Sequence, residues 1–204
     1  MAIHWTVLAR CSMAAVVVII LGQLTSGQPA DTTSAAVDLW SLAKEKHQSH
    51  RFSTLITAQQ VRDRLANDDG IEAALQWCRQ TAVTKVYIES FRDGYRAQLA
   101  TLEHARDRFR EAGFGVSGCV TPTNVGKRST GWNAISCYTD RATQDKLQDI
   151  FALAAGLFDE IMIDDFWFTD CKCPECDTAR KAKTVTIGEQ AFPVASDVWD
   201  DYRS

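Results

Sequence analysis

The stretch Glu160-Ile-Met-Ile-Asp-Asp-Phe-Trp-Phe168 decides the fold, because an apolar run leads directly into two carboxylates and then into three aromatic residues. Consecutive apolar residues are typical of a strand that is buried on both faces, as the strands of parallel sheets are. Functional side chains of parallel α/β folds gather at the carboxyl ends of the strands. The stretch therefore predicts a buried parallel strand with candidate functional residues where it ends.

Earlier segments repeat this strand pattern, and amphipathic helices are predicted between them. Apolar or β-branched runs predict strands at residues 52–57, 85–91 and 114–120, and residues 134–138 also have β character. Apolar residues at spacings of three and four predict helices at residues 71–78, 95–112 and 147–158. Strand, helix and strand in repeated order predict right-handed crossovers and a parallel sheet.

A β/α barrel and a doubly wound sheet share this order of elements. No Gly-rich phosphate loop follows the first strand, where Thr57-Ala-Gln-Gln60 resembles a capping box, and this favours the barrel. Asp69-Gly-Ile-Glu72 resembles a second capping box, and Gly113 is placed to end a helix in the left-handed conformation. A complete (β/α)8 barrel needs about 250 residues, so the predicted fold is a partial (β/α)8 TIM barrel of about four strands.

The first 30 residues have the pattern of a secretory signal peptide. Residues 1–30 carry one full charge, Arg10, followed by the apolar run Ala14–Leu21, which is too short to span a bilayer. Small and polar residues follow at Thr25–Ala30, and we expect cleavage near Gly27–Ala30. We therefore expect a secreted or periplasmic protein with no stable membrane anchor. An uncleaved N-terminal anchor is the alternative.

The rest of the chain predicts one domain after a short connection. Residues 31–50 are polar and predict a linker or a short helix, and the partial barrel occupies residues 51–204. The formal net charge is −4, from 22 basic and 26 acidic residues. No run of basic residues accompanies an aromatic stripe, so we expect no nucleic-acid partner. The sequence leaves the oligomeric state open.

The candidate catalytic residues are carboxylates at strand ends. Asp164 and Asp165 end the last predicted strand, and Glu89 lies near the end of the second. Side chains alternate along a strand, so we expect one aspartate to point into a cleft within reach of Glu89. Carboxylates beside aromatic rings suit a sugar, because they supply a nucleophile and an acid/base while rings stack on pyranose faces. The candidate sugar-binding residues are Trp167, Phe168, Tyr138 and Tyr87.

A second interpretation of the same residues is structural. In this interpretation Asp164 and Asp165 cap the following loop, and Trp167 is a core residue. A buried carboxylate without partners is costly, so the pattern needs either a partner group or a function.

Three cysteines within six residues, Cys171, Cys173 and Cys176, indicate a metal site or disulfides. Three thiolates on one loop could hold zinc together with a fourth ligand from elsewhere, and disulfides are equally natural in an exported protein. Six cysteines follow residue 30, and six allow 15 pairings. Cys78 and Cys119 lie in apolar segments, where small buried side chains are expected. A thioredoxin-type redox pair is the weakest interpretation, because the cysteine pair does not open a helix after the first strand.

The segment Glu160–Cys176 resembles one found in glycoside-hydrolase-like TIM-barrel proteins, many of them uncharacterised. In these proteins the fourth strand ends in an Asp pair, followed by an aromatic residue and a Cys-x-Cys-x-x-Cys loop. Cys137-Tyr-Thr-Asp140 fits the same pattern, so the resemblance covers roughly residues 52–180. It implies a TIM-barrel fold, action on glycosides and a nucleophile at Asp164 or Asp165.

The resemblance also implies an incomplete domain. The general acid/base of such barrels comes from a later strand, and Val198–Ser204 has the pattern of a helix that is cut short. Glu89 is the other strand-end carboxylate, and its backbone is expected roughly 10 Å from the Asp pair. We expect an exported glycoside hydrolase, or its N-terminal half, with little turnover in this chain alone. The alternative is a non-catalytic exported protein that binds carbohydrate or is stabilised by a metal.

Overall fold

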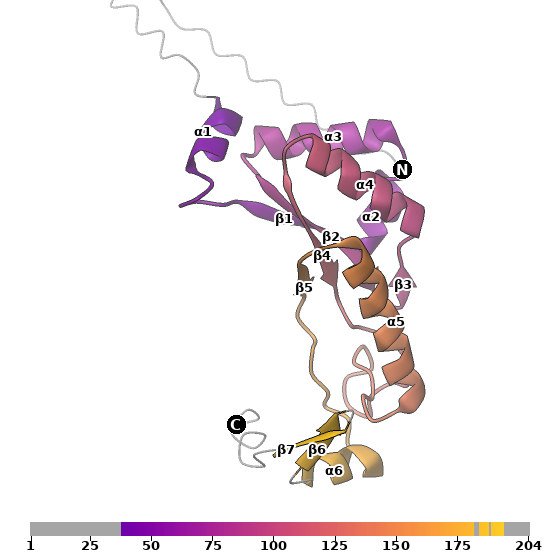
Figure 1. Cartoon of the computed structure of the whole chain (residues 1–204). Helices are drawn as coiled ribbons and strands as arrows, with labels where there is room; N and C mark the ends of the chain where they lie inside the picture. Colours follow the sequence, from indigo (N-terminus) through magenta and orange to yellow (C-terminus); the bar gives the residue numbers. More distant parts are fainter. Residues whose placement is uncertain (1–37, 182–183, 188, 194–204) are drawn as a thin grey trace, which may run out of the picture. The chain divides into compact units, whose positions relative to one another are not determined.

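The structure is a computed structural model that describes residues 38–181, 184–187 and 189–193 (Figure 1). The predicted signal peptide at residues 1–30 and the predicted helix start at residues 198–204 lie outside the described residues. The predicted connection contains the short helix α1 (Leu39–Lys46), which is capped by a hydrogen bond of 3.1 Å from the Trp40 backbone N–H to the Asp38 carboxylate.

Four parallel strands form the main sheet, in the order β1-β2-β4-β5. They are β1 (Ser53–Ile56), β2 (Lys85–Arg92), β4 (Gly115–Val120) and β5 (Ile161–Ile163). Helices lie between successive strands of this sheet along the chain (Figure 1). The fold class is therefore α/β with parallel strands, as expected, and the strand order is that of a partial TIM-like barrel.

The crossovers between the parallel strands are helical. Helices α2 (Ala58–Arg64) and α3 (Asp68–Gln80) follow β1, α4 (Leu99–Glu111) precedes β4, and α5 (Arg141–Leu157) precedes β5. After β5 come α6 (Pro174–Lys181) and an antiparallel pair of strands, β6 (Thr184–Ile187) and β7 (Gln190–Pro193). Within the described part of the chain, the helices are too short or too polar to cross a membrane.

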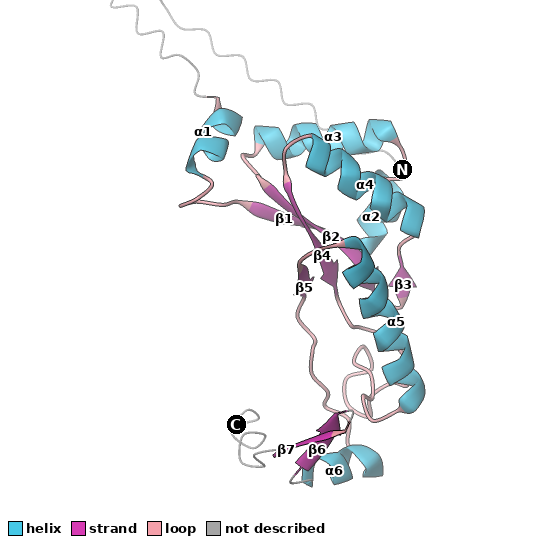
Figure 2. Ribbon diagram, viewed as in Figure 1, coloured by secondary structure: helices cyan, strands magenta, loops and turns pink. Residues whose placement is uncertain are grey.

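The helices that cover the sheet pack on one of its faces, as Figure 2 shows. Val86 and Ile88 of β2 are fully buried against Phe109 of α4 in the larger apolar cluster. A second cluster joins Val120 of β4 to Ile150 of α5. Because side chains alternate along a strand, the odd-numbered residues of β2 from 85 to 89 face the opposite side, which in a barrel is the interior.

The helix predicted to begin at Tyr95 begins only at Leu99, so that boundary is wrong. Asp93 and Gly94 have φ values of 52° and 74° and form a two-residue turn into β3 (Tyr95–Arg96). This strand pairs antiparallel with β2. An Asp-Gly pair with positive φ at both residues is the chemistry of a tight hairpin.

One predicted segment of β structure forms no strand, and another forms a shorter strand than expected. Residues 134–138 form no strand, and Ser136 makes only an isolated bridge to Arg128. The strand expected over residues 160–168 ends at Ile163, where its pairing with β4 stops. Both segments instead become loops, which lie beyond the carboxyl edge of the sheet.

The predicted helix ends are confirmed in two of three cases. Thr57 and Gln60 form the reciprocal capping box of α2, and Gly113 has a φ of 85° after α4. The box at Asp69–Glu72 is wrong, because Asn67 caps α3 by accepting a hydrogen bond of 2.9 Å from the Gly70 backbone N–H.

Candidate functional site

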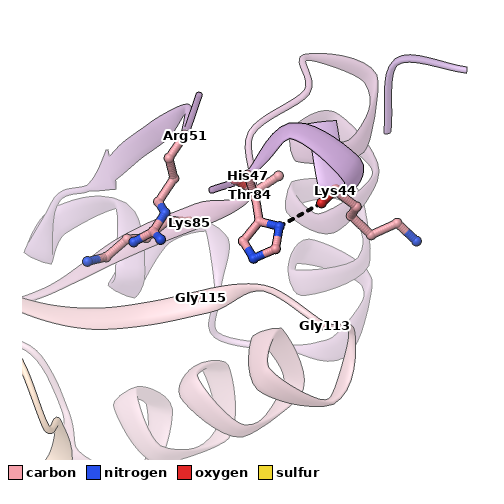
Figure 3. A pocket seen from close by; sticks show the side chains of 7 residues that line it. All are labelled: Lys44, His47, Arg51, Thr84, Lys85, Gly113 and Gly115. Atoms are coloured by element: carbon pink, nitrogen blue, oxygen red, sulfur yellow. Dashed lines mark hydrogen bonds between the residues drawn. The ribbon is translucent and has the colours of Figure 1, made fainter. Parts of the chain in front are cut away.

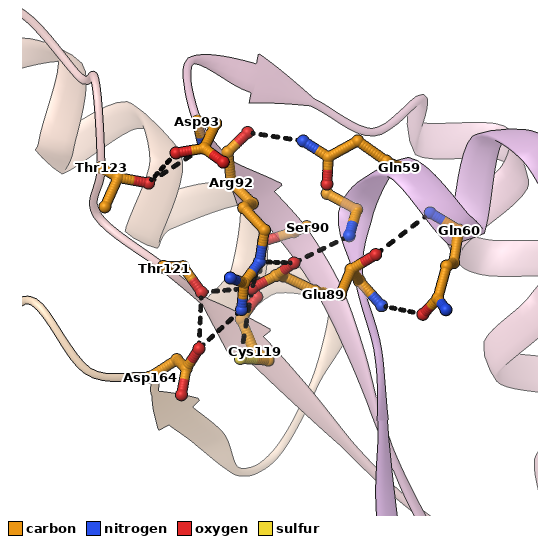
Figure 4. A network of polar contacts seen from close by, with 12 residues as sticks. Gln59, Gln60, Glu89, Ser90, Arg92, Asp93, Cys119, Thr121, Thr123 and Asp164 are labelled. Carbon is orange, nitrogen blue, oxygen red and sulfur yellow. Dashed lines mark hydrogen bonds and ion pairs between the residues drawn. The ribbon is translucent and has the colours of Figure 1, made fainter. Parts of the chain in front are cut away.

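Glu89 lies near the carboxyl end of β2 and is fully buried. Its carboxylate accepts a hydrogen bond of 2.8 Å from the backbone N–H of Ala58, at the start of α2, and another from the hydroxyl of Thr121. The thiol of Cys119 lies 3.8 Å from the same carboxylate. Glu89 therefore ties the ends of three neighbouring strands together at the carboxyl edge of the sheet (Figure 4).

Arg92 links Glu89 to Asp164. Its Nε donates to Glu89 Oε2 over 2.8 Å, and its Nη2 donates to Asp164 Oδ2 over 2.6 Å. The Thr121 hydroxyl lies within hydrogen-bonding distance of both carboxylates (Figure 4). The structure thus brings together two carboxylates whose strands are separated by β4. We call Glu89, Arg92, Thr121 and Asp164 the carboxylate network.

The two carboxylates also set the charge state of Arg92. Burial alone would lower the pKa of the guanidinium, but hydrogen bonds to Glu89 and Asp164 and their negative charges outweigh it and raise that pKa above its ordinary value. Arg92 is therefore a permanent cation between two acidic groups.

A bulge and a turn in the backbone orient the side chains at the end of β2. The pairing of β2 with β4 shifts register between Glu89 and Phe91, which is the signature of a β-bulge. Bulges redirect side chains and are common beside active sites. The Asp93–Gly94 turn follows at once, and the hydroxyl of Thr123 donates to the Asp93 carboxylate over 2.7 Å. The bulge and the turn bracket Arg92 and fix it at the end of β2.

The two aspartates at the end of β5 lie in different surroundings. Asp164, with its side chain 29% exposed, contacts Arg92. Asp165 is exposed and accepts a hydrogen bond of 2.9 Å from the backbone N–H of Phe166. Phe166 has a φ of 80°, a conformation that a bulky side chain rarely adopts. Strained backbone therefore lies directly beside the Asp pair.

Tyr138, Phe151 and Trp167 form a group that we call the aromatic wall. The ring centroid of Trp167 lies 5.6 Å from that of Tyr138 and 5.4 Å from that of Phe151. The hydroxyl of Tyr138 lies 3.4 Å from the carbonyl oxygens of Pro122 and Phe166. Burial raises the pKa of Tyr138 to about 12. Trp167 is 53% exposed, so the wall presents one indole to solvent.

The other two predicted aromatic residues lie apart from this wall. Tyr87 is on β2, where the ammonium group of Lys85 lies 4.7 Å from its ring centroid. Phe168 pairs with no other ring in the part of the chain that the structure describes. Trp132, which was not predicted, is 48% exposed, and its ring centroid lies 5.3 Å from that of Phe166.

Cys171, Cys173 and Cys176 come together with a fourth cysteine, Cys137. Their sulfur atoms all lie within 4.8 Å of one another, and all four side chains are buried. Four thiols at this separation could hold a metal ion. We call these residues the thiol cluster. It joins residues 121–140, the β4–α5 loop, to residues 164–176, the post-β5 segment.

Two cavities lie away from the carboxylate network. One of about 420 Å³ lies beside the amino-terminal ends of β2 and β4 (Figure 3) and is lined by Lys44, His47, Arg51, Thr84, Lys85, Gly113 and Gly115. Another of about 610 Å³ lies beside β1, α2 and α3, and the exposed Trp77 forms part of its lining. Neither is lined by Glu89 or Asp164, so we place the candidate site at the carboxyl edge on chemistry rather than on cavity size.

Sequence reasoning missed Arg92, Thr121 and Cys137 as site residues. Arg92 ends the second strand only three residues after Glu89, and Thr121 immediately follows the third. Both therefore occupy strand-end positions, and that signal was present in the sequence. Cys137 also lies near the end of a predicted β segment, but nothing in the sequence pairs it with cysteines more than thirty residues away.

The comparisons with known proteins give a family for the chain. Residues 36–204 match the model of a family described as "Probable glycosyl hydrolase, catalytic domain". The chain is also 27% identical over 128 residues to an uncharacterized protein of Saccharolobus solfataricus. That match spans 59% of this chain but only 21% of the relative, so the chain covers about a fifth of the relative's length. No solved structure matches the chain.

Proposed function

Because the chain belongs to the family of probable glycosyl hydrolase catalytic domains, we propose that the carboxyl edge of its sheet binds a carbohydrate and cleaves a glycosidic bond. The observation that carries this proposal is the pairing of Asp164 with Arg92 at the end of β5, three residues before the exposed Trp167. A carboxylate and an aromatic ring at one strand end are the two groups that a sugar site needs.

Asp164 is the group best placed to act as nucleophile. It is partly exposed, and the guanidinium of Arg92 holds it at 2.6 Å. Attack on an anomeric carbon needs an ionised carboxylate that the substrate can reach. Asp165 is the second candidate from the sequence, but Arg92 pairs with Asp164 and not with Asp165, whose carboxylate accepts a hydrogen bond from the Phe166 backbone.

Glu89 is close enough to Asp164 to be considered as acid/base. The Thr121 hydroxyl lies within hydrogen-bonding distance of both carboxylates. One oxygen of Glu89 and one of Asp164 are therefore separated by at most two hydrogen bonds, or about 6 Å. A retaining mechanism needs about 5–5.5 Å between its carboxyl groups. However, Glu89 is fully buried, and hydrogen bonds from the Ala58 N–H, Arg92 and Thr121 occupy its oxygens. We therefore propose that Glu89 positions Arg92 and that a proton donor lies elsewhere in the complete protein.

The aromatic wall is the proposed sugar-binding surface. Trp167 is three residues beyond Asp164, and Tyr138 holds the backbone of Phe166 between them. An indole that is half exposed and braced by two other rings offers a flat, apolar face to a pyranose.

The test compares two neighbouring aspartates. Asp164→Asn should lower kcat/KM on aryl glycosides by about a hundredfold or more, while Asp165→Asn serves as the matched control and should change it little. Because turnover by this chain alone is expected to be low, sugar affinity should be measured alongside the rate. Equal rates in both variants and the parent would exclude Asp164 as the nucleophile.

A non-catalytic carbohydrate-binding protein is the second candidate function. The burial of Glu89 favours it, because Asp164 is then the one accessible carboxylate of the network. In that case Trp167→Ala should weaken sugar binding, and Asp164→Asn should leave it nearly unchanged. A glycosidase should show the rate loss described above.

We also propose zinc as the ion for the thiol cluster, and export as the fate of the protein. Zinc favours four thiolates in tetrahedral arrangement, and such sites are structural.

Export rests on the short apolar run in residues 1–30 and places the protein outside the cytoplasm. Disulfides compete with metal for thiols in that environment.

A further inference from the structure

We infer that the thiol cluster is a closed metal centre that fixes the aromatic wall, with Cys137 as the ligand that links the two loops. The metal and its effect on the loops stand independently of the proposed function. Only the consequence for sugar affinity rests on that function.

The two sulfur separations measured from Cys137 match those of a tetrahedral thiolate site. A Zn–S bond of about 2.3 Å places neighbouring sulfurs of a tetrahedron about 3.8 Å apart. The sulfur of Cys137 lies 3.5 Å from that of Cys176 and 3.7 Å from that of Cys173. A pair of disulfides would satisfy the thiols two by two, but here the sulfur of Cys137 is close to two others at similar distances. Four protein ligands leave no open position, so the site is structural rather than catalytic.

The cluster joins two loops that have no regular secondary structure to hold them together. Neither the β4–α5 loop nor the post-β5 segment before α6 contains a helix or strand. They are otherwise linked by scattered hydrogen bonds, such as 2.6 Å from the Trp132 backbone N–H to Asp170 and 2.7 Å from the Lys172 backbone N–H to Thr130. A Cβ at Gly131 would overlap the Asp170 carboxylate, so a larger residue there would displace that side chain.

The same two loops supply the exposed part of the aromatic wall. Tyr138 directly follows Cys137, and Trp167 is four residues before Cys171. Thr139 reinforces the junction, since its hydroxyl lies 3.2 Å from the Cys137 sulfur and 3.1 Å from the Cys176 sulfur. Loss of the ion would therefore release the loops on either side of the contact between Tyr138 and Trp167.

The first experiment measures the metal itself. Purified chain should contain about one zinc per molecule, and Cys137→Ser should lose it, whereas Cys78→Ala, at a buried cysteine of α3, should keep it. Replacement by Co²⁺ should give the visible absorption of tetrahedral thiolate coordination. A chain without metal in which the four thiols are oxidised to disulfides overturns the inference, and so does one without metal in which they are free.

The second experiment measures the loops by hydrogen–deuterium exchange. Chelation of the metal should raise exchange about tenfold or more in the β4–α5 loop and the post-β5 segment, while β2 and α4 remain protected. Re-addition of zinc should restore protection, which keeps the test valid if Cys137→Ser fails to fold. Unchanged exchange in both loops, or equal loss of protection in the sheet, overturns the inference that the metal fixes the loops.

The third measurement tests whether the metal in the thiol cluster affects sugar binding. Chelation should weaken sugar affinity, or raise KM, more than it lowers kcat, because the wall and not Asp164 is released. If metal binding and loop protection behave as expected but no sugar binds in either state, then the proposed function fails, while the inference that the metal fixes the loops stands. If sugar binds equally well with and without metal, the metal does not control the aromatic wall.

Discussion

Arg92 shows how much depends on one residue that sequence reasoning overlooked. Glu89 is fully buried, and Arg92 is its cationic partner. Asp164, by contrast, is partly open to solvent and tolerates the loss of a partner better. The carboxylate network is therefore asymmetric: Arg92 stabilises a buried charge on one side and orients an accessible carboxylate on the other.

Arg92→Leu should lower the free energy of unfolding by about 3 kcal/mol, because it leaves the Glu89 carboxylate buried without its cation. Adding Glu89→Gln should recover at least about 1 kcal/mol by removing the charge. Arg96→Leu, at an exposed site on β3, is the control and should change stability by no more than about 0.5 kcal/mol. Urea unfolding measures all three. A stable Arg92→Leu variant would mean that Glu89 does not need the cation.

The candidate residues from the sequence differ in how well they could be foreseen. Asp164 and Glu89 were visible because strand ends concentrate functional groups in parallel folds, and the structure brings them together through Arg92. Their catalytic role stays a prediction. Cys137 was not visible, because the folding of two distant loops onto one another has no local pattern. Phe168 and Tyr87 were predicted to bind the sugar, but neither belongs to the aromatic wall, and their role stays a prediction.

At the scale of elements, the long periodic segments were the most predictable. The helix expected at residues 147–158 corresponds to α5, and the strand at residues 85–91 to β2. The hairpin at Asp93–Gly94 was missed, although an Asp-Gly pair after a strand is a strong turn signal. The apolar spacing from Tyr95 onward resembled a helix, and the turn chemistry overrode it.

The packing of α5 on β4 depends on a glycine. A Cβ on Gly118 would lie 2.5 Å from the ring of Phe158, which immediately follows α5. Gly118→Ala should therefore lower the free energy of unfolding by about 1–3 kcal/mol, as overpacked cores do. Phe158 is buried and cannot move far without disturbing the apolar cluster of β2 and α4.

Gly156→Ala supplies the matched control for this prediction. Gly156 lies within α5, and a Cβ there would meet no atom within 4 Å. This substitution should be neutral or stabilise the protein by about 0.5–1 kcal/mol, because alanine loses less backbone entropy in a helix. If both glycine variants have the same stability, the close contact with Phe158 is not what limits residue 118.

At the scale of the whole molecule, the parallel sheet followed from the sequence, whereas the region beyond the sheet did not. Parallel pairing is predicted by the alternation of strands and helices. The loops at the carboxyl edge are held instead by single contacts, such as the thiol cluster, and by the bulge in β2. These depend on which side chains meet after folding, so no periodicity reports them. The same edge carries the candidate site, which is why the fold was easier to predict than the function.

Buried groups that lose protons at high pH make the whole fold sensitive to alkali. Burial raises the pKa of the Cys78 thiol from 9.0 to about 11 and that of the Tyr138 hydroxyl to about 12. Burial also raises the pKa of the Cys119 thiol to about 12, and the negative charge of Glu89 contributes to this rise. Above pH 9 the unfolded chain releases the Cys78 proton while the folded chain retains it. The unfolded state then binds fewer protons, so stability is complete below about pH 9 and falls as the pH rises.

Cys78 can be isolated from the other groups by one substitution. Because burial raises the pKa of its thiol from 9.0 to about 11, the stability that this group contributes is lost progressively as the pH rises from about 9 through 11. Cys78→Ala should be less stable than the parent at pH 7, because it leaves a small cavity in the core, yet it should lose less stability on going to pH 11. Urea unfolding at pH 7, 9 and 11 measures the difference, with Cys119 and Tyr138 acting equally in both proteins. A gap between parent and variant that stays constant over this range would mean that the folded chain does not hold the Cys78 proton, and that α3 does not seal its thiol from water.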